Sequence, residues 1–362
     1  MYKKLLLTMT ALAIATGAMA AEEKVLNVYN WSDYIDDSIL KDFTKETGIK
    51  VVYDVFDSND LLETKLLAGG SGYDVVVPSG AFLTRQIQAG VFQKLDKSKL
   101  SNYGNMWDSV LKQIDQYGPL NEYAINYLWG TTGIGYVKDK IEKRMPNAPV
   151  DSLAMLFDPN VISKFADCGV HILDAADELI PAALAYLGED PDSKDKKVIA
   201  KAGELMAKVR PHILKFHSSE YINALANGDI CLAIGWSGDV FQARDRAAEA
   251  KNNVEVVYSI PKEGGLMWFD MMAIPKDAPH PDNAHVFLNY IMRPGVIAKS
   301  TNYVSYANGN KASQAQVDPA ILADPAIYPT AEVMKTLYIV TPYDPKIQRV
   351  VTRLWTKVKS GQ

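Results

Sequence analysis

Three short segments place a tryptophan within three positions of an aspartate: Trp31-Ser32-Asp33-Tyr34, Trp236-Ser237-Gly238-Asp239 and Trp268-Phe269-Asp270. A carboxylate accepts charge-assisted hydrogen bonds from an ammonium group, and the face of an aromatic ring attracts the same cation. These side chains together therefore indicate an organic amine as ligand. Because the three segments lie far apart in the sequence, they can act together only where the fold brings them into one cleft.

The elements that would position these segments alternate between strands and helices. Residues 25–29, 49–56 and 73–77 are predicted strands, and residues 38–46 form a predicted helix that a glycine ends. Ser58-Asn59-Asp60 is typical of the start of a second helix. This order predicts an α/β fold, and we expect two lobes because 362 residues are too many for one ordinary core.

The aromatic and acidic segments lie where such strands end. In open α/β sheets, ligands collect beyond the carboxyl ends of the strands. Residues 31–34 follow the first predicted strand directly, and Pro78-Ser79 follows the third. Strand-like runs also border Trp236 and residues 268–270. We therefore expect all of these segments to face the same space.

The first twenty residues have the order of a secretory signal peptide. Lys3 and Lys4 precede an apolar stretch, and Ala18-Met19-Ala20 precedes the first acidic residues, which predicts cleavage after Ala20. The alternative, a membrane anchor, is disfavoured because the stretch is short and polar residues interrupt it. No later segment is apolar for long enough to span a bilayer, so we expect a soluble exported protein.

The charge balance excludes nucleic acid as a partner. The formal charge of −5 becomes −7 once residues 1–20, with Lys3 and Lys4, are removed. A mildly acidic chain without a basic run is not drawn to phosphates.

Cys168 and Cys231 are the only cysteines. In an exported protein an even pair usually closes a disulfide, and a separation of 63 positions lacks the spacing of a zinc site or a redox CxxC motif. We therefore expect a disulfide that places both segments in one domain.

An enzyme is the alternative from a different class. Glycoside hydrolases also combine paired carboxylates with tryptophan platforms. The chain has no GxSxG, P-loop or HExxH motif, and its five histidines lack metal-ligand spacing. We therefore expect no enzyme, no cofactor and no metal site.

Several further segments carry a resemblance to a known family. Residues 24–362 resemble the periplasmic polyamine-binding proteins of bacterial ABC importers, the putrescine-binding branch most closely. The matching stretches are residues 30–35, 73–79, 129–136, 216–219, 226–231 and 236–239.

The resemblance implies a two-lobed type II periplasmic binding fold. In this fold each lobe is a mainly parallel sheet flanked by helices, and the ligand binds in the cleft between lobes that close by a hinge motion. Residues 22–127 with 250–293 would form one lobe, and residues 128–249 with 294–362 the other. The family also implies a Cys168–Cys231 disulfide, a monomer in the periplasm, and a membrane permease as partner.

The family's ligand contacts can be carried over position by position. Trp31, Trp236, Trp268 and Tyr306 match aromatic walls, and Asp33, Asp239 and Asp270 match carboxylates that receive ammonium groups. Ser32, Tyr34 and Ser79 match positions around one amine, and Ser218 matches a hydroxyl that lines the cleft. Where the family presents a glutamate, this chain has Asp177 with Glu178 beside it, and either could meet the far amine.

Two sets of alternatives stay open. Putrescine is the first expectation for the ligand, with a spermidine-preferring or dual receptor as the second, and cadaverine or agmatine also possible. Asp33, Asp239 and Ser79 could instead serve as helix N-caps, since each is expected shortly after a strand.

Overall fold

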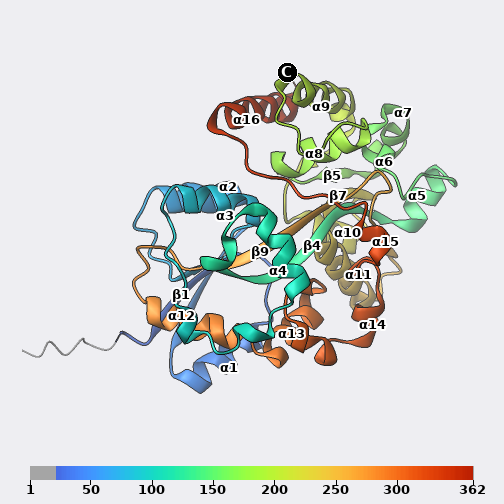
Figure 1. Ribbon diagram of the computed structural model, residues 1–362. Helices are drawn as coiled ribbons and strands as arrows, with labels where there is room; N and C mark the ends of the chain where they lie inside the picture. Colours follow the sequence, from blue (N-terminus) through green and yellow to red (C-terminus); the bar gives the residue numbers. More distant parts are fainter. Residues whose placement is uncertain (1–21, 362) are drawn as a thin grey trace, which may run out of the picture.

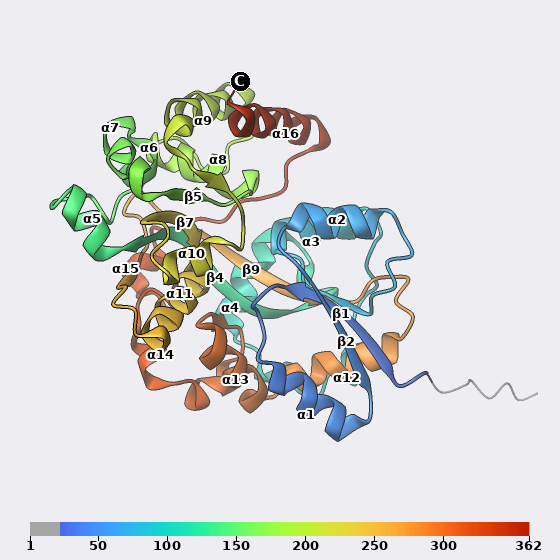
Figure 2. The ribbon, with the colours of Figure 1, turned by 180° about the vertical axis from the view of Figure 1, so that it is seen from behind.

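The computed structural model describes residues 22–361, so the predicted signal peptide lies outside the described residues. Its elements gather into two bodies that β4 (Ala124–Val137) and β9 (Leu266–Ala273) connect (Figures 1 and 2). The predicted α/β fold is confirmed.

The first body is built around a parallel β1. This strand (Val25–Trp31) pairs with β2 (Lys50–Phe56) on one side and with β3 (Val75–Val76) on the other. In Figure 2, α1 (Asp37–Thr47) and α12 (Pro281–Ile291) cover one face of this sheet, and α2 (Asn59–Leu67) and α3 (Gly80–Gln88) cover the other.

Local signals explain these elements. Gly48 ends α1 in the left-handed conformation at φ 72°, which costs a glycine little. Ser58 begins α2, where its hydroxyl accepts a hydrogen bond from the backbone N–H of Leu61. The predicted strand at residues 73–77 is shorter in the structure, since only Val75–Val76 pair as a strand.

The second body is a smaller parallel sheet with its own helices. The strand β5 (Val170–Ile172) pairs in parallel with β6 (Lys215–Phe216) and with β7 (Leu232–Trp236). The helices of this part are α5 (Lys138–Arg144), α6 (Ala154–Phe157), α7 (Pro159–Ile162), α8 (Ala176–Tyr186), α9 (Lys196–Val209), α10 (Tyr221–Ala226), α11 (Ser237–Ala250) and α16 (Pro345–Ser360).

The long strand β4 joins the two sheets into one. All fourteen of its residues are buried. Its first part pairs antiparallel with β9, from Ala124 opposite Ala273 to Thr132 opposite Leu266. Its last part pairs with β7 and with β8 (Val256–Ser259), which gives the order β2-β1-β3-β9-β4-β7-β5-β6. The remaining elements are α4 (Asp108–Ile114), α13 (Pro294–Val304), β10 (Ala307–Asn308), α14 (Pro319–Ala323) and α15 (Ala331–Met334).

The predicted disulfide is present. Cys168, before β5, is bonded to Cys231, before β7, and the two Cα atoms lie 5.5 Å apart. The bond therefore ties two neighbouring parallel strands of the second body together. Over residues 22–361, none of the helices combines the length and the apolar character that a bilayer crossing requires.

Candidate functional site

A cleft with about 430 Å³ of empty space, part of it open to solvent, lies between the two bodies; we call it the main cavity. Its lining comes from both sides: the ends of β1 and β3 contribute from the first body, and α8 and the end of β7 from the second. The strand β9, which links the bodies, also contributes. The lining residues are Trp31, Ser32, Tyr34, Asp57, Asn59, Ser79, Glu178, Ser218, Trp236, Asp239, Trp268, Asp270 and Tyr306.

Asp270, on β9, is held by two hydroxyl groups. Ser79 Oγ donates to Asp270 Oδ1 at 2.6 Å, and Tyr34 Oη donates to Oδ2 at 2.8 Å. Ser79 occupies the N-cap position of α3 but makes no side-chain capping bond, so its hydroxyl serves Asp270 instead. Burial raises the pKa of Asp270 to about 7, although both hydroxyls act in the opposite direction.

Asp239 is held in the same manner from the second body. Tyr306 Oη donates to Asp239 Oδ1 at 2.7 Å, and Tyr221 Oη donates to Oδ2 at 2.8 Å. Asp239 lies in the first turn of α11, whose N-cap position is taken by Trp236, so Asp239 does not cap the helix. Burial raises the pKa of Asp239 to about 7.

Glu178 is the third buried carboxylate of the cavity. The Trp236 indole donates from Nε1 to Glu178 Oε1 at 3.1 Å, and the Thr132 hydroxyl donates to Oε2. Burial raises the pKa of Glu178, and the neighbouring Asp177 raises it further, while both hydrogen bonds lower it. The hydrogen bond from Trp236 also fixes the orientation of its indole ring, which forms one wall of the cavity.

Aromatic rings pack edge to face around the three acids. The ring centroids of Trp31 and Trp236 lie 5.5 Å apart, and those of Trp268 and Tyr306 lie 5.3 Å apart. The indole of Trp31 is fixed by a hydrogen bond of 2.8 Å from Nε1 to the carbonyl oxygen of Val77. Trp268 has room because residue 130 is a glycine: a Cβ there would lie 2.9 Å from Trp268 Cζ2.

The structure brings together every predicted ligand residue except Asp33 and Asp177. Asp33 has a left-handed backbone at φ 54°, and its carboxylate is paired with Arg246 of α11 at 2.6 Å. Asp177 lines two adjacent cavities with Asp60 of α2. Of the two neighbouring acids on α8, it is therefore Glu178 that faces the main cavity.

Three further residues were not predicted. Asp57 and Asn59 line the cavity, and Asn59 Nδ2 donates to Ser79 Oγ at 3.1 Å. Their place directly after β2, at the carboxyl end of a parallel strand, is a signal that could have found them. Tyr221 supports Asp239 from behind, and no local motif marks it.

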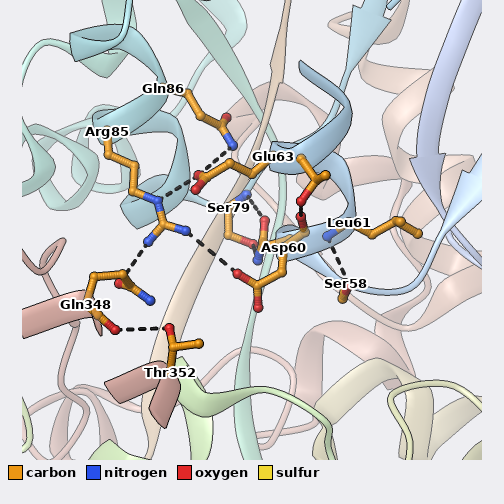
Figure 3. Close-up of polar contacts among 11 residues, drawn as sticks. Ser58, Asp60, Leu61, Glu63, Ser79, Arg85, Gln86, Gln348 and Thr352 are labelled. Carbon is orange, nitrogen blue, oxygen red and sulfur yellow. Dashed lines mark hydrogen bonds and ion pairs between the residues drawn. The ribbon is translucent and has the colours of Figure 1, made fainter. Parts of the chain in front are cut away.

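A second polar contact joins the bodies beside the cavity (Figure 3). The Arg85 guanidinium of α3 lies against Glu63, with 2.6 Å between Nε and Oε2, and reaches Gln348 of α16, with 3.3 Å between Nη1 and Oε1. Its Nη2 lies 3.9 Å from Asp60 Oδ1. The contact between Arg85 and Gln348 therefore links α3 of the first body to α16 of the second body beside the main cavity.

The arrangement can bind an elongated organic cation. Its lining contains several carboxylates but no lysine, arginine or histidine. Among the described residues there is no group of three or more side chains suited to hold a metal ion. A ligand with ammonium groups at its ends and methylenes between them would match the acids and the aromatic faces.

Comparisons with known proteins agree with this chemistry. A family model described as bacterial extracellular solute-binding protein matches residues 38–330. The chain is similar to the putrescine-binding periplasmic protein SpuD of Pseudomonas aeruginosa, with 54% identity over 100% of this chain and 99% of that protein. It is also 52% identical to the putrescine-binding periplasmic protein PotF of Escherichia coli, over 97% of this chain and 95% of the other.

More distant relatives and solved structures share the fold. The spermidine/putrescine-binding periplasmic protein of Escherichia coli is 34% identical over 91% of this chain and 90% of its own length. A putative spermidine/putrescine ABC transporter from Listeria monocytogenes superimposes with a TM-score of 0.81 at 29% identity, over 94% of this chain and 100% of that one.

Proposed function

The chain belongs to the family of bacterial extracellular solute-binding proteins, and on this premise we propose that it is a periplasmic receptor that binds putrescine and delivers it to an ABC importer. The observation that carries the proposal is the set of three buried carboxylates, Glu178, Asp239 and Asp270, in a cavity whose lining supplies no cation.

A diamine would supply the cationic partners that these buried carboxylates lack. Buried carboxylates without a cationic partner are costly, and the raised pKa values of Asp239 and Asp270 express that cost. A hydrogen bond to a charged group contributes roughly 1.5–3 kcal/mol, and a desolvated cation–π contact about 2 kcal/mol. Two ammonium groups that each make such a hydrogen bond and such a cation–π contact would support micromolar binding, about −8 kcal/mol.

Spermidine is the second candidate, because the cavity has an acidic neighbour. An adjacent cavity shares Trp31, Glu178 and Trp236 with the main one and adds Asp60 and Asp177. A triamine placed in the main cavity could direct its third ammonium group there. Relatives at 34% identity are spermidine/putrescine-binding proteins.

The two bodies correspond to lobes that close over the ligand. The predicted lobe boundaries, residues 22–127 with 250–293 and residues 128–249 with 294–362, stay a proposal. The lobe boundary expected at residue 250 should lie closer to β9, because β8 pairs with Ile134–Val137 of β4 and therefore belongs with β7 in the second lobe. The hinge then consists of β4 and β9, the strands that both lobes share.

Export and transport complete the proposal. Residues 1–20 form a signal peptide that is cleaved after Ala20, which N-terminal sequencing of protein from the periplasm tests. The monomeric receptor then presents its closed form to a membrane permease.

Isothermal titration of the ligand-free mature protein tests the binding function. Putrescine, cadaverine, agmatine, spermidine and spermine are titrated in turn, with a neutral sugar as control. We expect one-to-one binding that is tightest for putrescine, and mass spectrometry should recover the amine unchanged. Preference for spermidine would favour the second candidate. Absence of heat with every amine, or turnover of any of them, would overturn the proposal.

A further inference from the structure

Two aspartates of the site, Asp270 and Asp239, are held by hydroxyl groups in the same way. Each carboxylate oxygen accepts a hydrogen bond from one hydroxyl group: Ser79 and Tyr34 serve Asp270, while Tyr306 and Tyr221 serve Asp239. Three of these four hydroxyl residues line the cavity, and Tyr221 does not. Tyr221 can therefore affect ligand binding only through the residues that it contacts.

Tyr221 is fixed between β7 and α11. Its side chain is 1% exposed, at the first position of α10. Its hydroxyl oxygen accepts a hydrogen bond of 3.0 Å from the backbone N–H of Trp236 and donates one of 2.8 Å to Asp239 Oδ2. Its ring lies against residue 235, where a glycine leaves the space for it. The hydroxyl has thus no freedom to turn towards another partner.

We propose that Tyr221 is a positioning residue for ligand binding, which keeps Asp239 charged and oriented as an ammonium acceptor without touching the ligand. This inference rests on the proposed function, because it assigns a role towards the same amine. It separates the four hydroxyl groups into three that face the ligand and one that acts only on the acceptor.

The physical basis is the charge state of a buried acid. Burial is the main influence that raises the pKa of Asp239 to about 7, and the nearby charge of Asp33 also raises it. The hydroxyls of Tyr306 and Tyr221 and the charge of Arg246 lower it. Asp270 is a second buried acid of the same lining, and the charge of Asp239 raises the pKa of Asp270. Without the Tyr221 hydroxyl, more of Asp239 is protonated at neutral pH, and a protonated carboxyl cannot meet an ammonium group with its full charge.

The test measures putrescine affinity of wild type and Tyr221→Phe from pH 6 to pH 9. The variant keeps the ring that fills the space and removes only the hydroxyl. We expect affinity at pH 7 to fall by about tenfold, the size of one hydrogen bond to a charged group, and the loss to shrink towards pH 9. Tyr258→Phe is the matched control, because among the described residues its buried hydroxyl forms hydrogen bonds with Thr131 alone and forms none with Asp239. It should leave the pH profile unchanged.

A double-mutant cycle with Asp239→Asn separates the two bonds of Tyr221. If Tyr221 acts through the carboxylate, Tyr221→Phe should cost nothing further once residue 239 is an amide. A loss of the same size at every pH, or one that persists in the Asp239→Asn background, would assign Tyr221 to the Trp236 backbone and overturn the inference. Unaltered affinity would overturn it as well.

Two controls keep the conclusion clear. If wild-type protein fails to bind putrescine at pH 8, the proposed function fails, whereas binding by wild type with no effect of Tyr221→Phe removes only the inference.

If Tyr221→Phe does not fold, 3-fluorotyrosine at position 221 replaces it. A more acidic phenol donates more strongly, so the midpoint of the pH profile should move down, and an unmoved midpoint contradicts the proposal.

Discussion

Arg246 of α11 donates from Nη2 to Asp33 Oδ1 at 2.6 Å, so an ion pair joins the second body to the loop that follows β1. Asp33 directly follows Ser32, which lines the cavity. A residue that the sequence marks as a ligand acceptor is therefore placed at the edge of the site, where it holds the two bodies together.

Arg246→Gln should release putrescine faster. The pair is partly exposed, with 34% and 41% of the two side chains accessible, so its contribution is small, about 0.2–1 kcal/mol. Stopped-flow dissociation measures the change, and raising the salt concentration should reduce the difference from wild type. Arg293→Gln is the matched control, since its pair with Glu46 is as short, is somewhat more exposed, and lies within the first body. Equal release rates in both variants would contradict a role in closure.

Asp270→Asn should weaken putrescine binding by about 1.5–3 kcal/mol, because the amide lacks the charge that an ammonium group seeks. Calorimetry measures the loss. Asp54→Asn serves as the control: Asp54 also accepts a bond from a tyrosine, Tyr73, at 2.9 Å, but it is not part of the cavity lining. Normal affinity of Asp270→Asn would leave Asp270 with a structural role only.

Trp236→Ala should weaken binding by roughly 2–4 kcal/mol, as aromatic anchors do at other interfaces. Trp236→Phe should fall between this variant and wild type, since it retains a ring but loses the hydrogen bond from Nε1 to Glu178. Equal losses in both variants would show that the bond to Glu178, and not the ring face, is what matters.

The ligand-free protein should lose stability as the pH rises from about 4 to about 7. Asp239 and Asp270 have folded-state pKa values of about 7, above the value near 4 of an unfolded aspartate, so between these values the folded state binds more protons than the unfolded chain. Thermal unfolding of wild type and Asp239→Asn isolates the effect, because the variant should show a shallower decline. Putrescine should stabilise most at pH 8, where both acids are charged. Equal slopes for the two proteins would refute this account.

Removing the Cys168–Cys231 disulfide should lower stability without changing affinity. The bond closes a loop of 63 positions, for which the loop-entropy relation gives about 4 kcal/mol. Urea unfolding of the Cys168→Ser, Cys231→Ser double variant measures this loss. Both cysteines lie outside the cavity lining, so a changed Kd for putrescine would mean that the bond also shapes the site.

Much of the fold and site could be predicted from local sequence signals. The helix at residues 38–46 and the strand at residues 49–56 appear as α1 and β2 with nearly the predicted bounds. Trp31 and Asp239 could be predicted to meet because each lies at or just after the end of a strand. Asp270 differs from the prediction, because residues 268–270 lie inside the continuous strand β9 and not between two strands. Family resemblance then supplied Tyr306 and Ser218, which carry no local signal of their own.

The remaining features depend on contacts between distant segments. The direction of the Asp33 side chain follows from its left-handed backbone and from Arg246, which lies 213 positions later. The choice between Asp177 and Glu178 depends on which face of α8 meets Thr132 and Trp236. Tyr221 can be recognised as part of the site only from its hydrogen bond to Asp239 Oδ2. Patterns along the chain do not encode such relationships.

Trp268 and Asp270 lie on β9, one of the two strands that run from one body into the other. If β4 and β9 form the hinge that we propose, side chains on β9 would move little when the bodies rotate, and we expect the open receptor to present one acceptor and one ring in nearly their final places. We therefore expect the association rate constant to depend on β9 and the dissociation rate constant on contacts made only after closure, such as the one between Arg246 and Asp33. If the proposed hinge is correct, a receptor built in this way would load quickly at low ligand concentration and would keep its ligand until the hinge is opened.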